Sequence, residues 1–373
     1  MQNKTIAITA NTCWYIYNFR RNTIIALLDH GYSVIACAPR DDYTYMLESL
    51  GCKYQDVKID KSGLNPIKDL YTIFNFYTLF KTNHVDVVLN FTPKNNIYST
   101  FAARLCKIKV INNIAGLGTA FGSTGLINFI VRHLYRYSQK EADFIFFQNQ
   151  EDYSIFQRLG INKRSMDILP GSGVDLKRFT FQEATDNGIT RFAVVARMLF
   201  DKGIVQYADA AKILKTKYRD NVEFLLIGFI DDLNPRSITS AKMKEWVDEG
   251  HVKYLGVSDN IEDILGDVDC VVLPSFYREG VPKSLLEAAA MGKPLITTDN
   301  VGCRETVEDG KTGYLCQPRS VSDLCDKMEL IINMHLEDRI AMGKAGRELI
   351  EKKFDEQIVI KKYLMALQTV LNK

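Results

Sequence analysis

Short apolar runs alternate with longer segments of helical periodicity along the whole chain. In the first half the pattern predicts a helix over residues 17–30 and strands at Thr5–Thr9, Ser33–Ala38, 85–90, 110–113 and Phe144–Phe147. Nearly continuous apolar strands separated by helices are typical of a parallel sheet that is covered on both faces. The first half is therefore predicted to form a Rossmann-like domain.

The periodicity lapses around residues 170–188, which are rich in Gly, Asp and Thr and read as a connection between domains. It then resumes, with strands predicted at residues 192–196, 222–228, 252–255, Cys270–Leu273 and 294–298. The fold class is α/β, with two tandem Rossmann-like, doubly wound parallel-sheet domains facing a cleft. We expect domains at residues 1–172 and 173–354, and a C-terminal helix at 355–373 packing back on the first domain.

The most specific segment is SFYREGVPKSLLE, residues 275–287, which directly follows a predicted strand and so lies at the carboxyl edge of a sheet. Ligands of doubly wound sheets bind at that edge. Pro282 suits the first turn of a helix. Gly280 and Val281 would then offer backbone amides to phosphate oxygens, and Glu287 could accept the hydroxyls of a ribose. For the spacing of Glu279 and Glu287 alone, the alternative is a solvated helix face.

This segment, with EGVP at its head and LLEAAAMGKPLITT behind it, resembles the GT-B-type retaining glycosyltransferases that carry an E-x7-E motif, and the resemblance extends over nearly the whole chain. It implies that Glu279 lies against the donor sugar and that Glu287 holds the nucleotide ribose. It also implies a nucleotide-sugar donor in the C-terminal domain and an acceptor in the N-terminal domain, with transfer in the cleft.

A second element, FAVVARMLFDKG, places Arg197 and Lys202 in a loop before a helix. The resemblance implies that both cations bind the departing diphosphate, where charge develops in the reaction. Gly228 matches a family glycine near the nucleotide, with a plain strand-to-loop turn as the alternative. Val257 and Ile261 are candidates for contact with the base.

Further on, VGCRETVEDGKTGYL is similar to a family block in which a second glycine stands at the position of Cys303. Cysteine has a side chain where glycine has none, and this puts in doubt a close approach of the backbone to a ligand at this point.

The first domain departs further from the family pattern. Its opening loop, ANTCWYIYNFR, lacks the family's glycines, so we expect Asn11 and Thr12 to contact the sugar through their side chains. Lys94 follows Pro93, where many relatives carry a histidine, and is assigned to acceptor or phosphate contact, with a solvated lysine as the alternative. The segment INNIAGLGTAFGS, which includes Gly118, resembles a signature of bacterial surface-polysaccharide transferases and adds a further acceptor candidate.

Charge is distributed unevenly between the halves. Residues 1–180 carry 21 Lys and Arg against 14 Asp and Glu, and the remainder carries 26 against 31. No acidic residue occurs between Asp86 and Glu141, a stretch of 54 residues. Such an excess favours contact with an anionic partner, whether nucleic acid, anionic lipid or a phosphorylated substrate.

Within this stretch, Arg132, Arg136 and Lys140 recur every four residues, while apolar side chains line another side of the same predicted helix. That combination favours a membrane interface, although an ordinary surface helix is the alternative. The apolar and aromatic positions Leu70, Ile73, Phe74, Tyr77 and Phe80 would extend the same surface.

The eight cysteines are scattered, without a CxxC pair or a metal-binding cluster, and no apolar run reaches the roughly 20 residues of a spanning helix. We expect reduced thiols, no metal, and a cytoplasmic chain lying peripherally on the inner face of the cell membrane. Dehydrogenase and P-loop functions lack their fingerprints.

These features lead to one functional prediction. The chain is expected to move a sugar, an N-acetylhexosamine from a UDP-sugar, to a saccharide on polyprenyl diphosphate in bacterial surface-polysaccharide assembly. Nucleic acid is not an expected partner. The alternatives are a nucleotide-sugar epimerase of similar fold and a catalytically inactive partner subunit.

Overall fold

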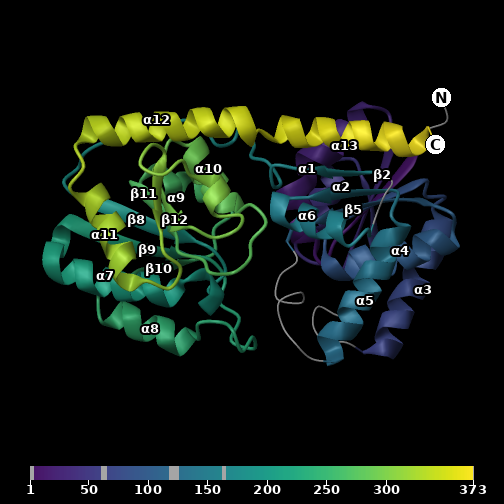
Figure 1. Ribbon diagram of the computed structural model, residues 1–373, viewed down its shortest axis with the longest axis horizontal. Coiled ribbons are helices and arrows are strands. Elements are labelled where there is room, and N and C mark those ends of the chain that lie inside the picture. The colour runs from purple at the N-terminus through teal and green to yellow at the C-terminus, as the bar shows by residue number, and fades with distance from the viewer. Residues whose placement is uncertain (1–3, 60–64, 117–125, 162–164, 373) are drawn as a thin grey trace. The chain divides into compact units, whose positions relative to one another are not determined.

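The computed structural model describes residues 4–59, 65–116, 126–161 and 165–372. Its contacts divide the chain into two compact units (Figure 1). The N-terminal unit comprises Met1–Ser172 together with Gln357–Lys373, and the C-terminal unit comprises Gly173–Glu356. Each unit is a parallel sheet with helices on both faces.

The sheet of the N-terminal unit has seven strands in the order β3-β2-β1-β4-β5-β6-β7, all parallel. The order reverses beside β1, where Ile6 pairs with Val34 on one side and Val87 on the other. The strands are β1 (Thr5–Thr9), β2 (Ser33–Ala38), β3 (Lys53–Asp56), β4 (Val87–Asn90), β5 (Lys109–Ile114), β6 (Phe144–Phe147) and β7 (Met166–Ile168).

Helices cover both faces of this sheet. One face packs against α1 (Cys13–Asp29), α2 (Thr44–Ser49) and α13 (Glu356–Leu371), and the other against α3 (Pro66–Thr82), α4 (Pro93–Leu105), α5 (Leu126–Glu141) and α6 (Gln150–Arg158). Local sequence explains where the helices begin. Asn65 caps α3 by accepting bonds from the amides of Ile67 and Lys68, and Pro66 supplies a helical φ at the first position.

The sheet of the C-terminal unit has six parallel strands in the order β10-β9-β8-β11-β12-β13. They are β8 (Thr190–Val195), β9 (Val222–Ile227), β10 (Lys253–Gly256), β11 (Cys270–Leu273), β12 (Leu295–Thr298) and β13 (Gly313–Cys316). The helices α7 (Ile204–Tyr218), α8 (Ser240–Asp248) and α11 (Val321–Ile332) pack on one face, and α9 (Ile261–Gly266), α10 (Lys283–Ala290) and α12 (Leu336–Lys353) on the other.

The predicted fold class of two Rossmann-like parallel sheets is confirmed, but three strands escaped the sequence analysis. They are β3, β7 and β13, and each lies at the edge of its sheet. An edge strand has only one neighbour and stays partly exposed, so its sequence need not be a continuous apolar run. The segments KYQD, MDI and GYLC are accordingly short and mixed in polarity.

The terminal helix α13 packs within the N-terminal unit. The ring of Tyr363 is buried edge-on against Phe91 and Phe146, and its hydroxyl donates a 2.6 Å hydrogen bond to Asn113 Oδ1. Lys362 forms a 2.8 Å ion pair with Asp167 at the sheet edge. These contacts hold the last helix on the first domain's sheet although it is remote in sequence.

Candidate active site

Two of the predicted catalytic side chains touch in the C-terminal unit. The Lys202 ammonium forms an ion pair with Glu279 Oε1, and both side chains are largely buried. The Ser275 hydroxyl donates a 2.9 Å hydrogen bond to the same Glu279 oxygen. The carboxylate is therefore held by a cation and a hydroxyl at the carboxyl edge of the sheet.

Close backbone packing brings the two loops together. Lys202 ends a short 3-10 turn after β8, and Gly203 follows with φ of 77°. A Cβ atom at Gly203 would lie 2.1 Å from the carbonyl oxygen of Pro274, at the start of the loop that carries Glu279. The amides of Phe276 and Tyr277 both donate to the carbonyl of Asp201. Only glycine permits this approach, so the turn fixes Lys202 beside Glu279.

Arg197 differs from Lys202 in its surroundings. Its side chain is exposed, and no carboxylate or other acceptor pairs with its guanidinium among the residues the structure describes. Burial raises the pKa of the neighbouring Tyr277 hydroxyl, and so does the Glu279 carboxylate, whereas the charges of Arg236 and Arg197 oppose that rise. Arg197 is thus a cation beside the Lys202–Glu279 pair that is available to a ligand.

Glu287 lies in a second charged cluster. Its oxygen is 3.7 Å from Lys283 Nζ, one turn earlier on α10, and only 13% of its side chain is exposed. Burial raises the pKa of Glu287, while Lys283 and Arg178 oppose the rise. Arg178 in turn holds Glu262 by two hydrogen bonds of 2.8 and 2.7 Å. The four predicted charges are therefore split, with Lys202 and Glu279 in direct contact and Glu287 among other partners.

The start of α10 corrects one expectation. Pro282 is the residue that precedes the helix, with ψ of 116°, and the helix begins at Lys283. The amides of Gly280 and Val281 find no acceptor among the described residues. They remain available to a ligand just before the helix, where its dipole is positive.

The segment with Cys303 shows how close approach is retained. Gly302, with φ of 84°, is the residue that contacts the loop, because a Cβ atom there would lie 1.6 Å from the carbonyl oxygen of Gly280. Cys303 is fully buried, and burial raises its pKa to about 12. Replacing the second glycine of the family block therefore does not remove the close backbone contact.

The remaining residues predicted to contact the sugar donor lie after strands β9 and β10. Gly228 follows β9 with φ of 146°, and a Cβ atom there would lie 1.8 Å from the carbonyl oxygen of Ala196. This packing alone requires glycine, so the turn suffices to explain the residue. Val257 is exposed after β10, and Ile261 is the first residue of α9.

Sequence reasoning missed several residues of this site. Ser275 and Tyr277 are within the motif, and Arg178 lies in the connection between domains, yet none was assigned a role. A polar or aromatic residue directly after a buried strand was the signal for the first two. Nothing in the sequence pairs Arg178 with Glu262, because 84 residues separate them.

Both units match families of glycosyltransferases in comparisons with known proteins. Residues 6–149 match the family model described as glycosyl transferase 4-like, and residues 177–349 match the model described as glycosyl transferases group 1. The chain is 29% identical, over 95% of its length and 96% of the relative's, to the N,N'-diacetylbacillosaminyl-diphospho-undecaprenol alpha-1,3-N-acetylgalactosaminyltransferase of Campylobacter jejuni. The chain belongs to the GT-B glycosyltransferases.

Two further matches extend the comparison. The UDP-Gal:alpha-D-GlcNAc-diphosphoundecaprenol alpha-1,3-galactosyltransferase of Escherichia coli is 24% identical over 75% of this glycosyltransferase and 77% of its own length. Among solved structures, Anabaena HepE in complex with UDP and glucose superimposes with a TM-score of 0.79 at 15% identity, covering 98% of this chain and 100% of that one.

Acceptor candidates of the glycosyltransferase occupy the N-terminal unit. Thr12 caps α1, its hydroxyl oxygen accepting a 3.0 Å bond from the Tyr15 amide, and Asn11 stands just before it at the carboxyl end of β1. Lys94 Nζ has no hydrogen-bond partner among the described residues and lies 3.7 Å from Asp69 Oδ1. Gly118 lies outside the described residues.

The helix that the sequence predicted to contact the membrane surface is α5. Arg136 and Lys140 are exposed on it and Arg132 is partly exposed. The side chains of Phe129 and Ile130 are also exposed. Phe80, which was expected to join the same surface from α3, is instead buried in the core beneath that helix. The prediction for Phe80 was wrong because it faces the sheet, one turn from the buried Phe76.

The described part of the enzyme lacks two features, a metal-binding cluster and a membrane-spanning helix. No cluster of three or more His, Cys, Asp or Glu side chains there could hold a metal ion. No described helix combines the length and apolar character needed to cross a membrane.

Proposed function

We propose that this enzyme transfers an N-acetylhexosamine from a UDP-sugar to a saccharide carried on polyprenyl diphosphate, with retention at the anomeric carbon, in bacterial surface-polysaccharide assembly. The observation that carries the proposal is the full-length similarity to a transferase whose name specifies N-acetylgalactosamine and an undecaprenyl-diphosphate acceptor. The UDP complex of a structural neighbour supports the choice of donor.

The donor is assigned to the C-terminal unit. Arg197 and Lys202 bind the diphosphate, and the amides of Gly280 and Val281 bind its oxygens. Glu287 accepts hydroxyls of the ribose, and the backbone near Gly228, Val257 and Ile261 meets the base. In the free enzyme Glu279 already neutralises Lys202. Donor binding therefore places a second anion beside this cation.

The chemistry needs no protein nucleophile. The bond from the anomeric carbon to the diphosphate oxygen breaks while an acceptor hydroxyl oxygen forms its bond on the same face. The departing phosphate takes the acceptor's proton. Glu279 stabilises the positive charge that develops at the anomeric carbon, and Arg197 and Lys202 stabilise the negative charge on the leaving group. We propose that no metal takes part, because these cations and amides supply the positive charge.

The acceptor is assigned to the N-terminal unit. Lys94, Asn11 and Thr12 contact its sugar or phosphate, and Gly118 belongs to the same assignment. Arg132, Arg136 and Lys140 contact anionic headgroups on the inner face of the cell membrane. Exposed cations and apolar side chains on one helix support this part.

A donor and acceptor panel tests the proposal. UDP-, GDP- and ADP-sugars are each incubated with polyprenyl-diphosphate-linked saccharides, and products are read by mass spectrometry and by NMR of the new linkage. We expect UDP-N-acetylhexosamine consumption only when acceptor is present, with a product of retained configuration. Conversion of the donor in the absence of acceptor would favour an epimerase. An inverted linkage would refute the proposed stereochemistry.

A further inference from the structure

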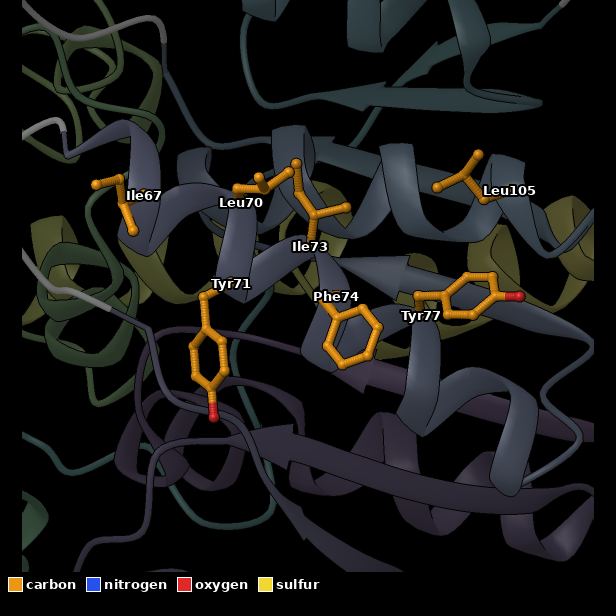
Figure 2. A pocket seen from close by; sticks show the side chains of 7 residues that line it. All are labelled: Ile67, Leu70, Tyr71, Ile73, Phe74, Tyr77 and Leu105. Carbon is orange, nitrogen blue, oxygen red and sulfur yellow. The ribbon is translucent and has the colours of Figure 1, made fainter.

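The N-terminal unit bears an apolar groove on the outer side of α3, as shown in Figure 2. Its volume is about 750 Å³. The side chains of successive turns of α3 line it, with one residue from the end of α4: Ile67, Leu70, Tyr71, Ile73, Phe74, Tyr77 and Leu105. Five of these side chains are exposed, with Leu70 67% and Phe74 62% exposed, whereas Ile73 and Tyr77 are partly buried against the core.

Exposure of this extent carries a free-energy cost. Helix α3 buries its opposite side through Phe76 and Phe80, so it does not need the five exposed side chains to fold onto the sheet. Large apolar patches on a protein surface mark contacts with a protein, a membrane or a ligand. Tyr71 and Tyr77 favour contact with a membrane, since amphipathic aromatic rings favour the boundary between hydrocarbon and water.

Charge around the groove selects the occupant. Helices α3, α4 and α5, three of the four helices on this face of the sheet, together carry seven Lys and Arg against two acidic residues, Asp69 and Glu141. Both acids are paired with cations of α4, Asp69 with Lys94 at 3.7 Å and Glu141 with Arg104 at 3.0 Å. The face is therefore net positive. A second copy of the same face would meet it with like charge, whereas an anionic bilayer would meet it with opposite charge.

We propose that the groove on α3 takes hydrocarbon chains of an anionic lipid bilayer, as a contact separate from the headgroup contact of α5. The inference rests on the membrane contact of the proposed function and adds where the chains enter. Apolar burial drives the α3 contact and Coulomb attraction drives the α5 contact, so the two respond differently to salt.

Tryptophan quenching tests the groove directly. Both native tryptophans, Trp14 and Trp246, are replaced by Phe, and Phe74→Trp is introduced as the reporter. Vesicles of phosphatidylglycerol and phosphatidylcholine with brominated acyl chains are then added. The matched control is Tyr45→Trp, because Tyr45 is 79% exposed on α2, which packs on the other face of the sheet. We expect quenching of the Phe74→Trp variant alone.

A binding assay separates the two contacts. Leu70→Ser with Phe74→Ser should weaken partitioning into these vesicles roughly tenfold or more, to a similar degree at low and high salt. Replacing Arg136 and Lys140 by Gln should weaken it chiefly at low salt. Both groove residues are mostly exposed, so unchanged thermal unfolding is expected to show an intact fold.

Several results would overturn the inference. These are equal quenching of both reporters, no quenching of Phe74→Trp, or a concentration-dependent dimer in sedimentation that the groove variant abolishes. Sugar transfer is not part of the readout. Quenching of Phe74→Trp without sugar transfer would support the groove and refute the proposed function. Sugar transfer without quenching would support the proposed function and refute the groove.

Discussion

The carboxyl edges of the two sheets are built from opposite chemistry. In the C-terminal unit that edge gathers charged side chains, with Lys202 against Glu279 and Glu287 against Lys283. In the N-terminal unit it gathers neutral amides. Thr9 donates to Asn90 at 2.6 Å, Asn90 donates to Asn112 at 2.8 Å, and Asn112 donates to Gln139 at 2.9 Å, all fully buried.

This difference predicts that one edge mainly serves ligand binding and the other mainly serves the stability of its unit. A buried neutral network can satisfy its members internally, and then it fixes the local structure. A mostly buried charge is costly unless it is paired, and it remains sensitive to any charged ligand that arrives. The charged edge is therefore where a diphosphate should act, and the amide edge is where the fold of the first unit should be most easily damaged.

The largest effect is expected at Glu279. Glu279→Gln should lower transfer about 10²–10³-fold, because it removes charge that acts in the transition state, while the fold is kept. Steady-state kinetics with the UDP-sugar and acceptor measure it. The control is Glu249→Gln, since Glu249 pairs with Lys212 at 2.9 Å and with His251 Nδ1 at 3.5 Å, none of which is assigned to the site. Equal activity of the two variants would contradict the assignment of this edge to catalysis.

The amide network gives the next largest effect. Asn112→Ala should cost about 2 kcal/mol of unfolding free energy because it leaves the buried Asn90 Nδ2 without an acceptor and the buried Gln139 Oε1 without a donor, yet it should not change UDP binding. Urea unfolding measures it in a Trp246→Phe background, where Trp14 reports on the N-terminal unit alone.

Asn75→Ala is the matched control for this network, since the Asn75 side chain makes no hydrogen bond among the described residues. Weaker UDP binding in Asn112→Ala, with unfolding unchanged, would reverse the contrast between the two edges.

Headgroup contact gives a comparable effect at low salt, which falls as salt screens the charges. Arg136→Gln with Lys140→Gln should weaken binding to anionic vesicles by about 2 kcal/mol at low salt, about 1 kcal/mol for each cation. Vesicle flotation across a salt series measures it. Replacing Lys352 and Lys361, which are exposed on α12 and α13, provides the control. Indifference to both mutation and salt would end the proposed role of α5.

The smallest effect concerns pH and Glu287. Burial raises the pKa of this carboxyl in the folded state, so its contribution to stability is greatest at acid pH and is lost as pH rises through the raised pKa. Without donor, Glu287→Gln should therefore be more stable than the wild type near neutral pH, and this gain should shrink toward pH about 4. Thermal unfolding at several pH values checks the trend. A gain that grows toward acid would show the opposite shift.

Some parts of the site could be predicted from the sequence and others could not. The segment 275–287 could, because a buried strand, a Gly-Val-Pro turn and a helix follow one another and local propensity decides each. The pairing of Arg178 with Glu262 could not, because it depends on how β8 to β11 are ordered. Asn90 and Asn112 were also overlooked, because polar side chains at the ends of buried strands read as strand termini.

By itself the sequence determined the two parallel sheets and the position of the donor motif, since apolar periodicity and turn chemistry act over a few residues. Tertiary structure decided that Lys202 meets Glu279 while Glu287 joins Arg178 and Lys283, and that Phe80 is buried while Phe74 is exposed. Those outcomes depend on packing between segments far apart in the chain, where the nearest partner is chosen by strand order and helix rotation rather than by local pattern.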